Sequence, residues 1–158
     1  MDMLEVDEFW ADLREFEMCM LVTRDGPFLR SRPMKTHYFD DDGTVRFLTS
    51  IDAHKVEELA ENPAANLVFQ NPDDNTWISV SGNARISVDR ADIDQVWHED
   101  ADPWFPGGKD EAAVLIVEPD IAEYWTFPES QLKAKWELLK GELTGAPPDL
   151  GENRKLEL

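Results

Sequence analysis

Residues 76–88 read Thr-Trp-Ile-Ser-Val-Ser-Gly-Asn-Ala-Arg-Ile-Ser-Val, and this stretch decides the fold. From Ile78 to Val88 the even-numbered positions are apolar except for Gly82, and the odd-numbered positions are mostly polar. Because successive side chains of a strand point to opposite faces, this alternation predicts a long strand whose even-numbered residues face a core. Gly82 predicts a bend in its middle, which a long strand needs where it curves around a small barrel.

Five other segments have the composition of strands and are bounded by turn signals. They are residues 18–23, 28–39, 44–49, 65–70 and 112–125, the last being either a strand pair or one bent strand. Asp25-Gly26 predicts a hairpin between the first two, and Pro33 predicts an edge or a bulge in the second. Six short strands with helices inserted between them indicate a mainly β protein that forms a small closed or half-open barrel.

Apolar residues at helical spacing predict helices around this barrel. An N-terminal helix is expected within residues 1–17, a short helix after Asp52 as its cap, another over 91–98, and a C-terminal helix and tail over 129–158. Residues 102–109 are expected to form a loop. No repeat or linker divides the chain, so residues 1–158 are expected to form a single domain.

The overall charge restricts the classes of partner. The 158 residues include 34 acidic and 15 basic side chains, for a formal net charge of −19. Nucleic acids and anionic membranes need a basic surface, so neither is expected as a partner. Cys19 is the only cysteine, which excludes an intrachain disulfide. The N-terminus lacks the regions of a signal peptide, and the longest apolar run, residues 112–117, is too short to cross a bilayer. These features predict a cytoplasmic protein.

One segment departs from this acidic character. Residues 24–55 hold six basic and five acidic side chains, and residues 28–39 hold three basic side chains and no acidic one. Arg30 and Arg32 stand two residues apart, so on a regular strand both project from one face. A pair of guanidinium groups on one face suits a planar or phosphorylated anion. Solvated strand charges are the alternative interpretation.

A second group of residues has the pattern of a phosphate site. Thr49 and Ser50 end a predicted strand, and His54 and Lys55 open the helix that follows. Hydroxyl groups at a strand end, backbone N–H groups at a helix N-terminus and a lysine in its first turn together favour phosphate binding. Ordinary capping and surface charge are the alternatives for each residue taken separately.

Other reactive residues have weaker patterns. His37, His54 and His98 lie on three different predicted elements without ligand-like spacing, so they are expected at the surface and no metal site is predicted. Cys19 lies in an apolar strand and is expected to be buried and unreactive. Trp104-Phe105 is either a mobile aromatic flap over a ligand or a hydrophobic plug. With no serine-histidine-aspartate arrangement visible, redox chemistry would need a cofactor.

Five short motifs occur in an order that is similar to a known family. They are Arg30-Ser31-Arg32-Pro33-Met34, Phe47-Leu48-Thr49-Ser50, His54-Lys55, Val80-Ser81-Gly82-Asn83-Ala84 and Trp104-Phe105-Pro106-Gly107-Gly108-Lys109. The chain resembles the pyridoxamine 5′-phosphate oxidase-like, FMN-binding split-barrel superfamily, and within it the bacterial general stress protein branch.

The resemblance implies a six-stranded Greek-key split barrel that forms a homodimer, with FMN in the clefts between the subunits. It assigns the cofactor-binding residues as Arg32, Pro33 and Met34 along the flavin ring, Leu48, Thr49, Ser50, His54 and Lys55 at and beside the phosphate, Trp77 as a further flavin contact and Trp104 closing the site. It assigns no catalytic residue and no metal.

The chain also departs from the true oxidases. Their C-terminal substrate-binding segment, with an arginine and a histidine after a tryptophan, is not found, so oxidation of pyridoxamine phosphate is not expected. The resemblance implies an FMN-dependent oxidoreductase with an unassigned small-molecule substrate. A flavin-binding stress or sensor protein without turnover, and a split barrel that binds haem or a deazaflavin, are the alternatives.

Overall fold

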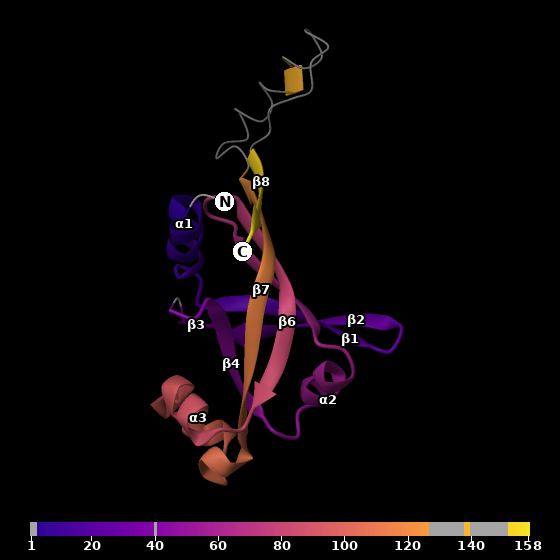
Figure 1. Ribbon diagram of the computed structural model, residues 1–158, viewed down its shortest axis with the longest axis vertical. Helices are drawn as coiled ribbons and strands as arrows, with labels where there is room; N and C mark the ends of the chain where they lie inside the picture. The colour runs from indigo at the N-terminus through magenta and orange to yellow at the C-terminus, as the bar shows by residue number, and fades with distance from the viewer. Residues whose placement is uncertain (1–2, 40, 127–137, 140–151) are drawn as a thin grey trace.

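The protein is an antiparallel β-barrel with short helices at its ends (Figure 1). The computed structural model describes residues 3–39, 41–126, 138–139 and 152–158. The strands are β1 (Met18–Asp25), β2 (Phe28–Lys35), β3 (His37–Phe39), β4 (Thr44–Ser50), β5 (Ala64–Asn71), β6 (Thr76–Ser87), β7 (Ala112–Thr126) and β8 (Glu152–Glu157). The helices are α1 (Met3–Leu13), α2 (His54–Glu61) and α3 (Arg90–Val96), with 3-10 turns η1 (Glu99–Trp104) and η2 (Gly108–Glu111).

The sheet closes because one bent strand pairs with both of its ends. The strand order is β2-β1-β5-β6-β7-β4-β3, and only Thr36 separates β2 from β3. β2 pairs with β1 while β3 pairs with β4, so the path returns on itself. Counting β2 and β3 as one strand, the described residues form a ring of six, with β8 outside it. The predicted mainly β split barrel is confirmed.

Gly82 lies where the long strand bends. The pairing of β6 with β7 shifts register between Ser81 and Gly82. A Cβ atom at position 82 would lie 2.0 Å from the carbonyl oxygen of Glu118, so the two backbones approach closely only because this residue is glycine. The prediction for Val88 is wrong: it is 59% exposed, since β6 ends at Ser87 and the chain turns into α3 before residue 88 can face a core.

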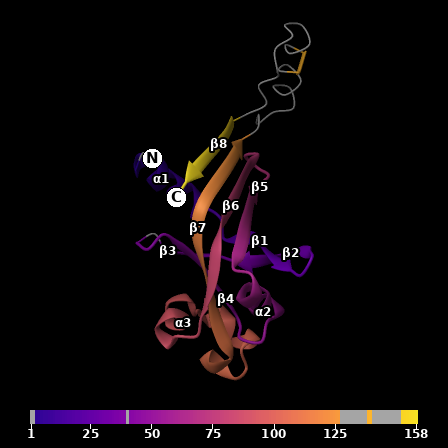
Figure 2. The same cartoon turned by 45° about the vertical axis from the view of Figure 1, so that its right-hand side comes forward.

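The C-terminal part differs from the expectation. Residues 112–126 form one long strand, β7, rather than a strand pair. β8, in a segment expected to be an irregular tail, pairs antiparallel with the outer half of β7, from Ile121 to Thr126 (Figures 1 and 2). Cross-strand pairing thus orders a polar segment that has no strand pattern of its own. The predicted C-terminal helix lies outside the described residues, apart from residues 138–139, which are helical.

The helices cover the barrel at different places. α1 places Phe9, Trp10 and Leu13 in the main core. α2 begins at His54 with Ala53 at its N-cap, and the expected cap by Asp52 is wrong. The segment expected to be a loop instead forms the 3-10 turns η1 and η2.

A second, smaller core lies outside the ring. Buried residues of α3, η1 and β7, with Phe39 and Leu48 packed against them, make up this cluster. It fixes η1 against the outer face of β4, which builds one wall of the site described below. No helix in the described residues has the length and hydropathy needed to cross a membrane.

Candidate functional site

A cavity of about 590 Å³ lies between the bent strand β2–β3, strand β4 and the η1 segment. Its walls are Pro33, Met34, Lys35, His37, Leu48, Thr49, Ser50, Lys55, His98, Asp100, Ala101, Trp104 and Phe105. Seven of the ten residues that the sequence predicts as cofactor contacts are among them: Pro33, Met34, Leu48, Thr49, Ser50, Lys55 and Trp104. The fold therefore brings most of the predicted site to one place, and the binding role of these residues remains a prediction.

One end of this pocket carries hydroxyl groups and a cation. Thr49 and Ser50 end β4, and Lys55 lies in the first turn of α2. The Ser50 hydroxyl accepts a hydrogen bond from the backbone N–H of Asp52 at 3.3 Å, so the turn between strand and helix is tied to this end. Among the described residues, no carboxylate lies within ion-pairing distance of the Lys55 ammonium group.

The protein disfavours the positive charge of Lys55. Burial lowers the pKa of its ammonium group, and the nearby guanidinium of Arg32 lowers it further, while Glu58 acts in the opposite direction. A half-buried cation without a paired anion suits an anionic ligand, which would offset both effects.

Arg30 and Arg32 do project from one face of β2, but an internal carboxylate occupies both. Arg30 Nη1 lies 3.3 Å from Glu58 Oε1, and Arg32 Nη2 lies 3.1 Å from Glu58 Oε2. Arg32 also donates to Thr23 Oγ1 at 2.8 Å, and the Thr23 hydroxyl donates to Glu58. Arg32 does not line the pocket, because Glu58, whose side chain is 1% exposed, draws its guanidinium toward α2.

His54 also lies outside the pocket walls. Its ring is exposed, and Nε2 lies 3.3 Å from Asp25 Oδ2 and 3.5 Å from Glu58 Oε1. Asp25, His54 and Glu58 offer ligand atoms within 4.8 Å of one another, the spacing of a metal site. Because Arg30 and Arg32 already neutralise Glu58, we interpret the cluster as an ion-pair network.

Trp77 lies elsewhere on the barrel, on its outer face. It lines a separate groove of about 410 Å³ with Val68, Ile78, Ser79 and Trp125. Within one chain, Trp77 therefore does not share the cavity that holds the other predicted residues.

The end of the pocket opposite Lys55 carries two histidines that the sequence reasoning placed at the surface. His37 on β3 and His98 just before η1 stack with ring centroids 5.8 Å apart and an interplanar angle of 29°. Burial lowers the pKa of His37 to about 4, with further contributions from His98 and Lys35, so its imidazole is neutral at pH 7. Nδ1 of His98 is buried without a hydrogen-bond partner among the described residues.

The two aromatic alternatives are divided between neighbouring residues. Phe105 is 8% exposed and packs against Trp97 in the second core, as a plug would. Trp104 is 81% exposed at the margin of the pocket, as a flap would be. The sequence pattern could not separate the two, because both rings are apolar and adjacent.

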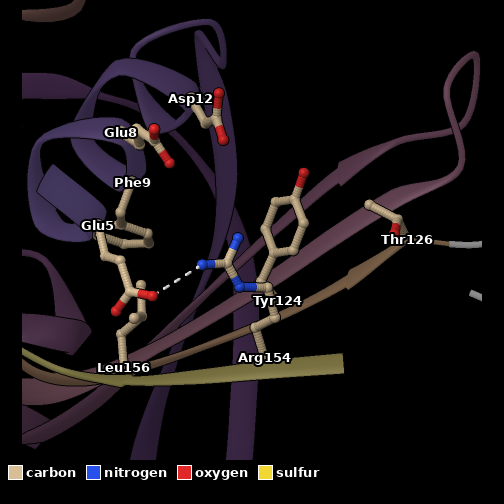
Figure 3. Close-up of a pocket in the computed structure, with 8 residues that line it drawn as sticks. All are labelled: Glu5, Glu8, Phe9, Asp12, Tyr124, Thr126, Arg154 and Leu156. Atoms are coloured by element: carbon tan, nitrogen blue, oxygen red, sulfur yellow. Dashed lines mark hydrogen bonds and ion pairs between the residues drawn. The ribbon is translucent and has the colours of Figure 1, made fainter. Parts of the chain in front are cut away.

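A smaller cavity, of about 130 Å³, lies between α1 and the β7–β8 pair (Figure 3). Three carboxylates of α1 face it, and Arg154 of β8 lies 3.3 Å from one of them, Glu5. Burial and the neighbouring Glu8 and Glu15 carboxylates raise the pKa of Asp12, so negative charge is crowded on this face of the helix.

Comparison with known proteins gives consistent results. The family model "Pyridoxamine 5'-phosphate oxidase like" matches residues 4–149. General stress protein 26 of Bacillus subtilis is 28% identical over 87 residues, which cover 52% of this chain and 62% of that protein. A crystal structure assigned provisionally to general stress protein 26 from Jannaschia sp. CCS1 has a TM-score of 0.70 and 26% identity, covering 98% of both chains.

A further solved structure carries a cofactor in its description. The general stress FMN/FAD binding protein of Xanthomonas citri has a TM-score of 0.67 and 27% identity, covering 78% of this chain and 89% of that one. The family match spans most of the sequence, and the solved structures share its barrel. The chain therefore belongs to the pyridoxamine 5′-phosphate oxidase-like family.

Proposed function

We propose that this protein is a flavoprotein that binds FMN in the pocket between β2–β3, β4 and η1 and acts as an oxidoreductase on a small molecule. The observation that carries the proposal is the meeting, in one cavity, of a hydroxyl-and-lysine end with an apolar middle. The FMN/FAD-binding relative of Xanthomonas citri supports a flavin as the ligand class.

The chemistry of the walls fits FMN. Thr49, Ser50 and Lys55 provide two hydroxyl groups and an ammonium group for a phosphate. Pro33, Met34 and Leu48 provide apolar surface for a planar ring, as ligand pockets usually do. The −19 net charge of the chain makes an anion-binding site elsewhere costly, which favours the one segment where basic residues balance acidic ones.

When bound, FMN supplies the hydride-transfer chemistry that the protein side chains lack. The residues of the chain have other tasks. Lys55 neutralises the phosphate, and Met34 and Leu48 exclude water from the ring. Trp104, exposed at the margin, covers the bound ligand. Arg32 acts indirectly, because its ion pair with Glu58 joins β2 to α2.

We also propose that two copies associate through the outer face of β1, β5, β6 and β7. Cross-strand pairing places Met20, Val68 and Ser79 on one face, and the groove beside Trp77 and Trp125 has no charged residue in its walls. A chain of net charge −19 repels its own copy elsewhere, so an uncharged apolar face is the place where a second copy can dock. Met20 pairs with Pro33, so this face continues to the pocket.

Titration of the purified protein with FMN, followed by flavin fluorescence and visible absorption, tests the cofactor. We expect saturable binding, and Lys55→Met should weaken it by about tenfold to a hundredfold, since hydrogen bonds to charged groups contribute about 1.5–3 kcal/mol. The matched control is Lys155→Met, at an exposed lysine of β8 whose side chain is 70% exposed. Binding of haem or a deazaflavin in place of FMN, or equal FMN affinity in both variants, would contradict the proposal.

Light scattering of the eluting protein tests the association. We expect a mass of twice 18.1 kDa for the wild type, and of one chain for Trp77→Asp. Val88→Asp, at an exposed apolar residue off this face, should remain dimeric. A single-chain mass for wild-type protein that binds FMN tightly would show that the pocket needs no second copy.

A further inference from the structure

The histidine end of the pocket has no role in the phosphate site. His37 opposes Arg46 in the pairing of β3 with β4, and Ser50 lies four residues farther along β4. At about 3.3 Å per residue, this places the two ends of the pocket about 13 Å apart. The pocket is therefore elongated, with a cationic end at Lys55 and an uncharged aromatic end at His37 and His98.

The two rings at this end have unused hydrogen-bonding capacity. Among the described residues, no hydrogen bond joins the His37 ring nitrogens to a protein group, and His98 Nδ1 is buried without a partner. A neutral imidazole has one N–H donor and one nitrogen acceptor. Buried polar groups in native proteins are nearly always paired, so a ring in contact with His98 and open to the cavity points to a ligand with complementary groups.

The surroundings favour a planar, uncharged partner. Pro33, Met34 and Leu48 form the apolar wall that leads to the histidines, and Trp104 stands at the margin. Lys35 and Asp100, of opposite charge, both lie at this end, so it carries no net charge beyond the histidines. A ligand group that pairs with a neutral imidazole needs an acceptor beside a donor, which is the pattern of an amide-like ring edge, C=O next to N–H.

We propose that His37, supported by the stacked ring of His98, is the subsite that binds the amide-like edge of a planar heterocyclic ring, opposite the phosphate end of the pocket. The inference rests on the proposed function, because the pyrimidine edge of a flavin has this pattern. It assigns recognition of the ring to His37 and recognition of the phosphate to Lys55. The ring edge accepts a hydrogen bond from one imidazole nitrogen and donates to the other, or to His98 after its ring turns.

The test uses two probes that share the ring and differ in the phosphate, riboflavin and FMN, titrated against the full chain by flavin fluorescence. His37→Phe keeps a flat ring for stacking on His98 and removes both nitrogens. We expect it to weaken riboflavin and FMN binding by the same factor, tenfold or more. Lys55→Met should weaken FMN binding and leave riboflavin binding unchanged. His37→Gln, which keeps a donor and an acceptor, should bind riboflavin more tightly than His37→Phe.

The outcomes separate the two proposals. Unchanged riboflavin affinity in His37→Phe, with FMN binding that still depends on Lys55, overturns the subsite and leaves the proposed function standing. Absence of binding of either probe to the wild-type protein overturns the proposed function and the subsite with it. If His37→Phe loses its native circular dichroism, the comparison passes to His37→Leu and His37→Gln, where equal riboflavin affinity overturns the subsite.

Discussion

Arg32 Nη2 lies 3.1 Å from Glu58 Oε2, in an ion pair that joins β2 to α2. These two elements carry Met34 and Lys55 into the same pocket. Glu58 is buried and bonded on both oxygens, so it fixes α2 against the barrel. The basic strand of this acidic chain thus serves first to compensate an internal carboxylate, and only Lys55 of the predicted phosphate-binding cations lines the cavity.

Glu58→Gln should destabilise the protein. The change leaves two guanidinium groups without their anion, and breaking a buried ion pair costs about 3–5 kcal/mol. We expect a smaller loss, about 2 kcal/mol, because Arg30 and Arg32 are 52% and 20% exposed and water can solvate them. Urea unfolding measures it. Glu57→Gln, at a neighbouring side chain that is 77% exposed, is the control and should change stability by less than about 0.5 kcal/mol. Equal losses in the two variants would exclude a structural role for the pair.

Gly82→Ala tests the bend of the barrel. The added methyl group would meet the Glu118 carbonyl oxygen at 2.0 Å, and a backbone atom cannot move aside as a side chain can. We expect a loss of about 3 kcal/mol or more, at the upper end for overpacked sites. Thermal unfolding, with Ser81→Ala at the adjacent exposed position as the control, measures the difference. A stability of Gly82→Ala within about 0.5 kcal/mol of the control would contradict the close approach.

The barrel could be predicted from the sequence because its signals are local. Period-two alternation located β6, and Gly82 marked its bend. β8 could not be predicted in this way, because a polar strand owes its order to pairing with β7 and not to its own composition. The cap of α2 was also missed, since Asp52 and Ala53 differ by one position and only the backbone geometry decides between them.

The site was predictable where its residues are close in sequence. Thr49, Ser50 and Lys55 surround one strand-to-helix turn, so their spacing indicates a shared site. His37 and His98 meet only because η1 packs over β3 and β4, and no local pattern joins residues that far apart. The compensation of Arg32 by Glu58 is a long-range contact of the same kind.

Cys19 should be unreactive in the native protein. It is 5% exposed in the main core, and burial raises the pKa of its thiol to about 12. Because the thiolate is the nucleophile, a thiol reagent at pH 8 should label less than a few per cent of native protein in the time that labels denatured protein fully. Mass spectrometry after timed alkylation measures both. Rapid labelling under native conditions would show that β1 opens or that the thiol is exposed.

Asp12→Asn should stabilise the protein at pH 7. Burial raises the pKa of Asp12 above its ordinary value of 3.8, and the Glu8 and Glu15 carboxylates raise it further (Figure 3 shows Asp12 beside Glu8). The folded state therefore binds this proton more tightly than the unfolded state, so the penalty is absent at low pH and grows as pH rises above about 4. The last turn of α1 adds to it, since the negative end of a helix disfavours a carboxylate.

Because Asp12 is exposed and its charge is screened, we expect a gain of only about 0.3–0.5 kcal/mol for Asp12→Asn at pH 7 and low salt. The gain should vanish at pH 3, where the carboxylate is protonated in both states, and shrink at high salt. Thermal unfolding at both pH values measures it. Asp7→Asn, one turn or more toward the positive end of the same helix, is the matched control and should give no gain. A gain in Asp12→Asn that persists at pH 3 would trace the effect to packing and not to charge.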